Sequence, residues 1–214
     1  MIKLDILSDP ICPWCYIGKT YVDRALEQRP NHPFEIEWHP FQLNPGMPAD
    51  GMDRVDYLET KFGGQTGAAR AYAPIVERAQ RLKLGIDFPA IERTPNTLDA
   101  HRLIHWAGLE GKQTAMVSRL FKAYFNEGRD IGHPSVLSRL AGEIGMERDM
   151  VDRLLASDGD RHDIRARDQH ARDRGVTGVP CFIIANQHVV PGAQDTEFWV
   201  QVIDELSAQE NSEE

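Results

Sequence analysis

Apolar and polar side chains alternate in two short stretches near the start of the chain. Residues 2–7 (IKLDIL) and 34–41 (FEIEWHPF) place apolar side chains at every second position, which is the pattern of a strand whose two faces differ. Between them, Pro13 suits the first turn of a helix, and Pro30 lies beyond the expected end of that helix. The pattern therefore predicts a strand, a helix and a second strand.

The pattern changes after residues 44–51 (NPGMPADG), which contain two prolines and two glycines and mark a boundary. From about residue 53 to 157 the apolar positions lie three and four residues apart, as in VLSRLAGEI, which predicts consecutive amphipathic helices. A charged helix is expected next. Residues 179–190 (VPCFIIANQHVV) then predict two short strands in a hairpin that turns at Asn186 and Gln187.

Strands near both ends of the chain, with helices between them, predict an α/β protein. A last helix is expected over residues 196–208. Without the helical block, the two ends of the chain make a unit of about 100 residues that can share one sheet. We therefore predict one α/β domain from residues 1–48 plus 160–214, interrupted by an all-helical domain at residues 49–159.

Composition and charge narrow the classes of partner. The 214 residues are 41% hydrophobic and 27% charged, which is typical of a globular protein. A formal net charge of -9 argues against nucleic acid and anionic membranes, because both are bound through clustered Lys and Arg. No stretch approaches the roughly 20 apolar residues that cross a bilayer, and the N-terminus lacks a signal-peptide core. We expect a cytoplasmic protein without nucleic-acid or membrane partners.

Two of the three cysteines lie close together in SDPICPWCYIGK, residues 8–19. In a reducing compartment such a pair is catalytic or metal-binding rather than a structural disulfide. The pair lies where the first predicted strand meets the first helix, and the free N–H groups and dipole of a helix start favour a thiolate. We expect Cys12 to be the exposed nucleophile and Cys15, one turn further on, to resolve a mixed disulfide.

A zinc site is the alternative for this pair, and the rest of the chain offers few ligands for it. Structural zinc takes four Cys or His ligands, and Cys181 is the only other cysteine. His101 and His105 are four residues apart on an amphipathic helix, but no glutamate completes a zincin motif. We expect no metal.

Five stretches of the chain carry a family resemblance: DPICPWCYIGK, WHPFQLNP, NTLDAHRLIHWA, LFKAYFNEGRDIG and GVTGVPCFIIANQHVVPGAQ. With them, in this order, the chain resembles the DsbA-like branch of the thioredoxin superfamily, and most closely its FrnE-type members. The resemblance implies a thioredoxin-like fold with an inserted helical domain. It also implies a protein disulfide oxidoreductase in which Cys12 and Cys15 exchange disulfides with protein or small-molecule thiols, with no required cofactor.

The same resemblance gives a role to GVP, residues 178–180. In relatives this proline is cis, and the backbone before it lies beside the two cysteines and pairs with an extended peptide or glutathione. The resemblance implies that Pro13, Trp14, Val179 and Pro180 contact the substrate. From the residues alone, a trans proline entering an edge strand is the alternative.

A second resemblance leaves another function open. DPICPWCYIGK, GVP and GAQDTEFW are also similar to kappa-class glutathione transferases and 2-hydroxychromene-2-carboxylate isomerases, which use glutathione as cofactor. Those enzymes carry serine where this chain has Cys12, and this departure favours redox chemistry. The resemblance implies that glutathione contacts Val179, Gln194 and Asp195, although Asp195 also suits the N-cap of the last helix.

Three further residues near these motifs each have two interpretations. Cys181 is a third redox-active sulfur or a buried small hydrophobe, which is the commoner role. Asp5 is a buried carboxylate that relays protons to Cys15, or it faces solvent. Asp9 is expected to be a turn or cap residue rather than a catalyst.

A third hypothesis is a non-catalytic peptide-binding module that uses an apolar cleft beside CPWC. Client binding that persists in a Cys12→Ser, Cys15→Ser double variant would identify such a module. In the glutathione-dependent alternative, Asn96, Thr97 and His101 would line the cleft from the helical domain, although these residue types also suit helix caps and surfaces.

Overall fold

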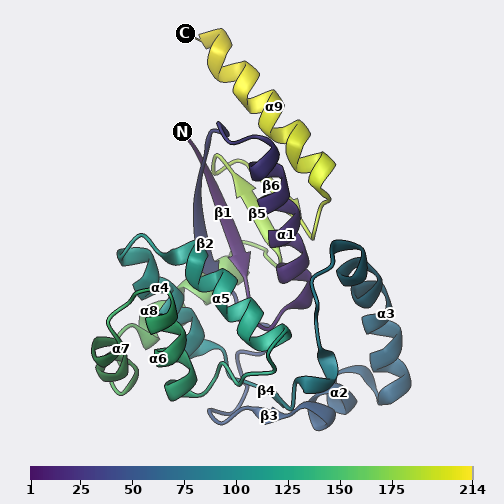
Figure 1. Ribbon diagram of the computed structural model, residues 1–214, viewed down its shortest axis with the longest axis vertical. Coiled ribbons are helices and arrows are strands. Elements are labelled where there is room, and N and C mark those ends of the chain that lie inside the picture. The colour runs from purple at the N-terminus through teal and green to yellow at the C-terminus, as the bar shows by residue number, and fades with distance from the viewer. Residues whose placement is uncertain (214) are drawn as a thin grey trace.

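A four-stranded sheet lies at the centre of the molecule (Figure 1). The computed structural model describes residues 1–213, with side chains up to residue 209. The strands follow the order β2-β1-β5-β6, with bounds β1 Ile2–Ser8, β2 Phe34–Pro40, β5 Cys181–Ile184 and β6 His188–Pro191. β1 is parallel to β2 and antiparallel to β5, and β5 is antiparallel to β6. The two ends of the chain thus share one sheet, which confirms the α/β prediction.

Helices α1 (Pro13–Gln28) and α9 (Thr196–Glu213) pack against each other. Leu4 and Ile6 project to the same side of β1, because alternate side chains of a strand share a face. They join Phe182 and Trp199 in the core, and none of the four is more than 1% exposed. α9 begins as predicted but continues beyond residue 208, and its far end extends past the sheet in Figure 1.

The β5–β6 hairpin turns through two residues in the left-handed region of backbone space. Ala185 and Asn186 have φ angles of 53° and 58°, and the Gln187 N–H donates to the Ile184 carbonyl over 3.0 Å. Two consecutive positive φ angles are typical of a type I′ turn, which suits the twist of a hairpin. The predicted hairpin is confirmed, with its turn centred one residue earlier than expected.

Helices make up most of the chain between β2 and β5. They are α2 Arg54–Phe62, α3 Gln65–Leu82, the 3₁₀ helix η1 Phe88–Ala90, α4 Leu98–Leu109, α5 Gln113–Phe125, α6 Pro134–Glu143, α7 Arg148–Leu155 and α8 Arg161–Asp173. The prediction of an all-helical insertion is wrong in one respect, because β3 (Met52–Asp53) and β4 (Arg93–Thr94) form an antiparallel ribbon. Strands of two residues leave no alternating pattern in a sequence. The domain bounds stay a prediction.

The inserted helices and the sheet share one core. α4 packs against α5, α6 and α8, and α5 also contacts β2. The Trp38 N–H of β2 donates to Gln113 Oε1 over 2.9 Å, and its indole Nε1 donates to Thr114 Oγ1 over 3.0 Å. Trp38 is buried, so these bonds satisfy polar groups that water cannot reach. The insertion therefore completes the interior of the sheet domain.

A buried arginine ties α4 to the turn before α8. Arg102 is 0% exposed, and its guanidinium donates to the carbonyls of Leu154, Ser157 and Gly159 over 2.7 to 2.9 Å. It also pairs with Asp99 at 2.8 Å. A buried cation is tolerated when all its donors are satisfied, so this set of bonds fixes the end of α7 against α4.

We expect Arg102→Met to destabilise the protein by roughly 3–5 kcal/mol, because it removes the donor to three backbone carbonyls and leaves Asp99 paired with Arg161 alone. Arg81→Met is the matched control. Arg81 is exposed and pairs with Glu77 one turn away on α3, so its loss should change stability by less than about 1 kcal/mol. Urea unfolding of both variants measures the difference, and equal effects would contradict the assigned role of Arg102.

Candidate active site

Cys12 is the N-cap residue of α1. Its N–H donates to the Asp9 carbonyl over 2.9 Å, and its carbonyl accepts the N–H groups of Cys15 and Tyr16 over 3.1 and 3.2 Å. The turn after β1 therefore ends at the cysteine, and Pro13 takes the first helical position as predicted. At this point the free N–H groups and the dipole of α1 favour negative charge on the sulfur.

The segment before β5 lies against the Cys12 sulfur. The Val179–Pro180 peptide bond is cis, as the family resemblance implied, and Cys12 Sγ donates to the Val179 carbonyl over 3.6 Å. α1 approaches this segment closely because Gly18 has no side chain. A Cβ there would lie 3.1 Å from Pro180 Cγ and 3.4 Å from the Phe182 ring. Residues far apart in sequence thus meet at the thiol pair.

The two thiols of the pair are both free and both buried. Cys12 is 3% exposed and Cys15 is 1% exposed. Burial raises the pKa of Cys15 well above that of an ordinary thiol, and the neighbouring Cys12 sulfur raises it further. The Ser8 hydroxyl and the Asp9 N–H lie against Cys15 and lower this pKa in part. Cys15 is therefore held as a protonated thiol.

The prediction that Cys12 is exposed is wrong, because Cys12 is buried and α3 of the insertion packs against the helix that begins at the pair. α3 packs against α1, and the Arg78 guanidinium lies 5.9 Å from the ring of half-buried Trp14. Burial chiefly raises the pKa of Tyr72 on α3, and the charge of nearby Cys12 contributes to that shift. Hydrophobic spacing shows that a helix has a buried face but not which neighbour covers it, so this contact could not be predicted from the local pattern.

Asp9 is completely buried beside the pair. Its carboxylate accepts the N–H of Leu43 over 2.7 Å and that of Ile11 over 3.4 Å, so it has the turn role that was predicted. Burial raises the pKa of this carboxyl to about 7, although hydrogen bonds from Leu43, Ile11 and Thr97 lower it. Asp9 can therefore change its charge near neutral pH, which the sequence did not indicate.

Asp5 and Cys181 lie on the face of the sheet opposite the core that contains the thiol pair. Asp5 alternates with Leu4 and Ile6 along β1, and its buried carboxylate contacts His39 Nε2 at 2.8 Å. Cys181 packs in a separate apolar cluster, and burial raises its pKa. This placement argues against a proton relay from Asp5 to Cys15, and it gives Cys181 the position of a buried hydrophobe.

Gln194 and Asp195 lie just before α9 and have local partners. The Gln194 side-chain amide donates to the Pro191 carbonyl over 2.8 Å, and Asp195 Oδ1 accepts the Phe198 N–H over 2.9 Å. Asp195 thus caps the helix, which was one of its two expected roles. Contact of these residues with glutathione stays a prediction.

Asn96 and Thr97 lie just before α4 and are largely occupied by contacts within the protein. Asn96 Nδ2 donates to the Met47 carbonyl over 2.7 Å, and Asn96 Oδ1 accepts the Leu98 N–H over 3.0 Å. Thr97 is buried beside Asp9. These contacts connect the start of α4 with the loop after β2.

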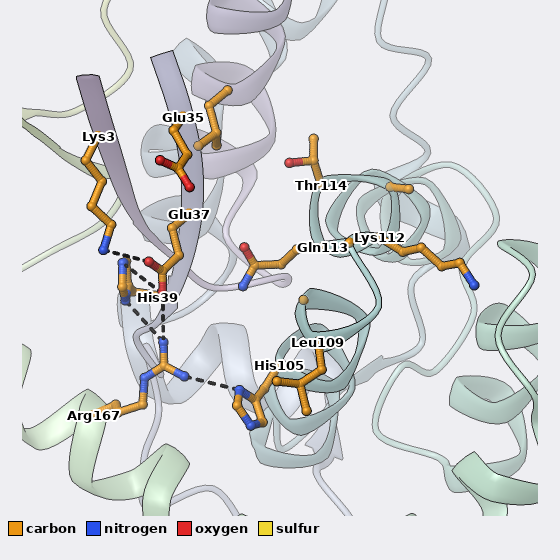
Figure 2. Close-up of a pocket in the computed structure, with 14 residues that line it drawn as sticks. Lys3, Glu35, Glu37, His39, His105, Leu109, Lys112, Gln113, Thr114 and Arg167 are labelled. Carbon is orange, nitrogen blue, oxygen red and sulfur yellow. Dashed lines mark hydrogen bonds and ion pairs between the residues drawn. The ribbon is translucent and has the colours of Figure 1, made fainter. Parts of the chain in front are cut away.

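A cavity of about 770 Å³ lies at the β2 edge of the sheet. Figure 2 shows Arg167 of α8 between Glu37 and His39 on one side and His105 on the other. Its guanidinium contacts His39 Nδ1 at 3.2 Å and His105 Nδ1 at 3.4 Å. His105 therefore faces this cavity, whereas buried His101 on the same helix lies near Asp9 at 3.8 Å. The two histidines do not form the joint zinc site considered above.

One group of side chains has the chemistry of metal ligands, and two of them, Glu37 and His39, line this cavity. Asp5, Glu37 and His39 offer ligand atoms within 4.8 Å of one another. Lys3 pairs with Glu37 at 2.7 Å and with Asp5 at 3.4 Å, and Arg167 lies 3.8 Å from Glu37. Two fixed cations repel a metal ion at this range, so we assign no metal to the group.

Asp9 is expected to make the stability of the protein depend on pH. Its pKa rises from about 4 in an unfolded chain to about 7 in the folded protein. Protonated Asp9 therefore makes its full contribution to the free energy of unfolding below about pH 4. This contribution is lost as the pH rises towards 7, and it changes no further above that. Asp9→Asn should flatten this fall in urea unfolding between pH 5 and pH 8. Asp195→Asn, an exposed cap, is the control, and an unchanged slope in Asp9→Asn would contradict the raised pKa.

Comparison with known proteins places this geometry in a family. Residues 3–204 match the DSBA-like thioredoxin domain. The chain is 29% identical over 203 residues to the uncharacterized protein YwbO of Bacillus subtilis (strain 168), with 94% of this chain and 96% of YwbO covered. A probable DsbA oxidoreductase from Streptomyces coelicolor has a similar structure, with a TM-score of 0.84, 28% identity, and 96% of this chain and 89% of that chain covered.

A 2-hydroxychromene-2-carboxylate isomerase shares the fold at 16% identity, with a TM-score of 0.74 and 99% of both chains covered. These matches confirm the thioredoxin-like fold with a helical insertion. Among the residues that the structure describes, no helix has the length and apolar character that a membrane span needs. The chain belongs to the DSBA-like thioredoxin domain family.

Proposed function

We propose that this protein is a FrnE-type thiol–disulfide oxidoreductase with Cys12 as nucleophile and Cys15 as resolving thiol. One observation carries the proposal. Cys12 lies at the N-cap of α1, 3.6 Å from the Val179 carbonyl, and Cys15 follows on the first turn of the same helix. A thiolate at this point can attack a disulfide that lies along the cis-proline segment.

The exchange takes two steps, and each step breaks one sulfur bond and forms another. The Cys12 thiolate attacks a disulfide R–S–S–R′, which forms Cys12–S–S–R and releases R′–S⁻. Cys15 then loses its proton and attacks the Cys12 sulfur, which forms the Cys12–Cys15 disulfide and releases R–S⁻. The substrate gains two electrons and the pair loses two. The reverse sequence transfers a disulfide to a dithiol.

The contrast between the two thiols sets the order of these steps. Burial and the neighbouring Cys12 sulfur raise the pKa of Cys15, which keeps Cys15 a thiol while Cys12 is free. Once Cys12 is bound in a mixed disulfide, its charge no longer opposes ionisation of Cys15. The pKa of Cys15 should then fall, which makes the resolving step easier.

We infer that the substrate contacts Pro13, Trp14, Val179 and Pro180. Trp14 is half-buried beside the pair, and the Val179 carbonyl lies next to the Cys12 sulfur. Because Cys12 itself is nearly covered, an extended peptide or glutathione suits the site better than a disulfide inside a folded domain. We propose protein or small-molecule thiols and disulfides as partners in the cytoplasm, with no resident cofactor.

A glutathione-dependent isomerase or transferase is the second candidate. The Gln194 and Asp195 side chains lie beside the β6–α9 turn, where the family resemblance puts the γ-glutamyl end of glutathione. Cys15 argues against this function, because it would attack a glutathione disulfide on Cys12 and release the glutathione.

We expect Cys12→Ser to abolish the reduction of insulin by dithiothreitol above the uncatalysed rate, because it removes the nucleophile. Cys15→Ser should accumulate a mixed disulfide between Cys12 and glutathione, which mass spectrometry of the intact protein detects. Cys181→Ser is the matched control and should retain activity within about twofold, because that thiol is buried in a separate cluster.

Two results would count against the oxidoreductase assignment. One is full activity in Cys12→Ser. The other is a wild-type protein that forms no Cys12–Cys15 disulfide with glutathione disulfide yet isomerises or conjugates a substrate in the presence of glutathione. The second result would favour the glutathione-dependent candidate.

A further inference from the structure

Another cavity lies over β5 and β6, on the face of the sheet opposite the core that contains the thiol pair. Its volume is about 650 Å³, and small-molecule sites typically have about 300–1,000 Å³. The strands β1, β5 and β6 form its floor, and the second half of α8 with the turn that follows forms one wall. This face of the sheet thus contains a space of ligand size that the proposed exchange reaction does not use.

The register of the strands makes the floor of this cavity apolar. Ile183 on β5 is paired with Val189 on β6, and Cys181 is paired with Pro191. Paired residues of antiparallel strands share a face, so these side chains form two neighbouring rows, and Leu7 of β1 extends the second row. Val189 is 61% exposed, although most large apolar side chains of the chain are buried. An open apolar floor favours a ligand with an apolar body.

The floor stays open because α8 lies over the other end of this sheet face. α8 packs against α4 and β2, and β2 and β6 are the two edge strands of the sheet. Ala171 of α8 packs in the cluster that contains Leu7 and Cys181. Val189 and Pro191, on the far edge strand, remain exposed. The cavity therefore deepens from the β6 edge towards α8.

The charged groups that line the cavity are mainly basic. Arg167, His170 and Arg174 all reach it from α8 and its C-cap. Among the described residues that line the cavity, Asp5 alone is acidic. Its carboxylate is already in contact with His39 Nε2 at 2.8 Å. The wall thus offers a ligand positive rather than negative charge.

Two of these basic side chains have no partner of their own. Arg174 and His170 make no side-chain hydrogen bond or ion pair with any residue that the structure describes. Arg167, in contrast, is held by His39 and His105 at 3.2 and 3.4 Å. The whole chain has a formal net charge of -9, so basic groups without acidic partners beside an apolar floor run against its overall charge. Charge complementarity therefore favours an anionic ligand at this wall.

We propose that this cavity binds a small amphipathic carboxylate. Its apolar chain lies on Ile183 and Val189, and its carboxylate pairs with Arg174 and His170. Arginine suits this role, because a guanidinium can donate two parallel hydrogen bonds to one carboxylate. The apolar chain removes the floor from water, which favours binding. The site lies across the sheet from the thiol pair, and the proposal does not rest on the proposed function.

Decanoate is the probe, because it joins a saturated chain to a single carboxylate. Added to the full-length protein with labelled Ile and Val methyl groups, it should shift the NMR signals of Ile183 and Val189, and calorimetry gives its Kd. Decylammonium has a similar chain and the opposite charge, so it should bind this site at least about tenfold more weakly. Cys12→Ser should bind decanoate as the wild type does, which separates this site from the exchange reaction.

The two halves of the ligand can be tested by separate variants. Arg174→Gln should weaken decanoate binding roughly tenfold, because it removes hydrogen bonds to a charged group. Val189→Glu should weaken it at least about tenfold, because it places a negative charge on an exposed part of the floor. Arg165→Gln is the matched control. It removes the same charge from an exposed position of α8 that does not line the cavity, so the Kd should stay within about twofold.

Equal weakening by Arg174→Gln and Arg165→Gln would overturn the proposal, because it would indicate attraction to the overall charge of α8. Decanoate that leaves the Ile183 and Val189 signals unchanged would overturn it as well. If the reduced insulin B chain shifts these signals and decanoate does not, the face binds a peptide instead. A dimer that Val189→Glu dissociates would assign the face to a second copy of the chain, and either result rejects the carboxylate site.

Discussion

The Asp9 carboxylate holds the turn between β1 and α1 from two sides. It accepts the N–H of Ile11 within the turn and the N–H of Leu43 in the chain after β2, while the Asp9 carbonyl accepts the N–H of Cys12. A buried carboxylate is costly unless it is hydrogen-bonded, and here its bonds also fix where the helix begins. The position of the Cys12 sulfur at the N-cap follows from this turn. Asp9 thus sets the geometry of the site and also has a pKa near neutral pH, at about 7.

Burial affects each titratable group at the site in a different way. It keeps Cys15 protonated, raises the pKa of Asp9 into the neutral range and leaves His101 uncharged. Cys12 is equally buried, but it lies at the start of a helix, where the dipole favours negative charge. Position relative to the helix start thus distinguishes two buried cysteines that are only three positions apart in the sequence. That difference is what an ordered two-step exchange requires.

Local patterns were enough to predict much of the fold. The β1 and β2 strands follow from alternating apolar positions, and the helix start follows from Pro13 next to a cysteine at a strand end. The cis bond before Pro180 came from family resemblance alone. Burial of Cys12 could not be predicted, because hydrophobic spacing identifies a buried face but not the element that covers it. The approach of His101 to Asp9 depends in the same way on a tertiary contact that no local pattern records.

The insertion is part of the site rather than an appendage to it. α5 satisfies the buried polar groups of Trp38 on β2, and α3 packs against α1, the helix that begins at the thiol pair. α4 brings His101 to within 3.8 Å of Asp9, and Thr97 just before that helix hydrogen-bonds the same carboxylate. A sheet domain without these helices would leave Asp9 and Cys15 open to water, and solvation would return their pKa values towards ordinary ones. The chemistry of the pair therefore depends on helices that lie between the two halves of the domain that carries it.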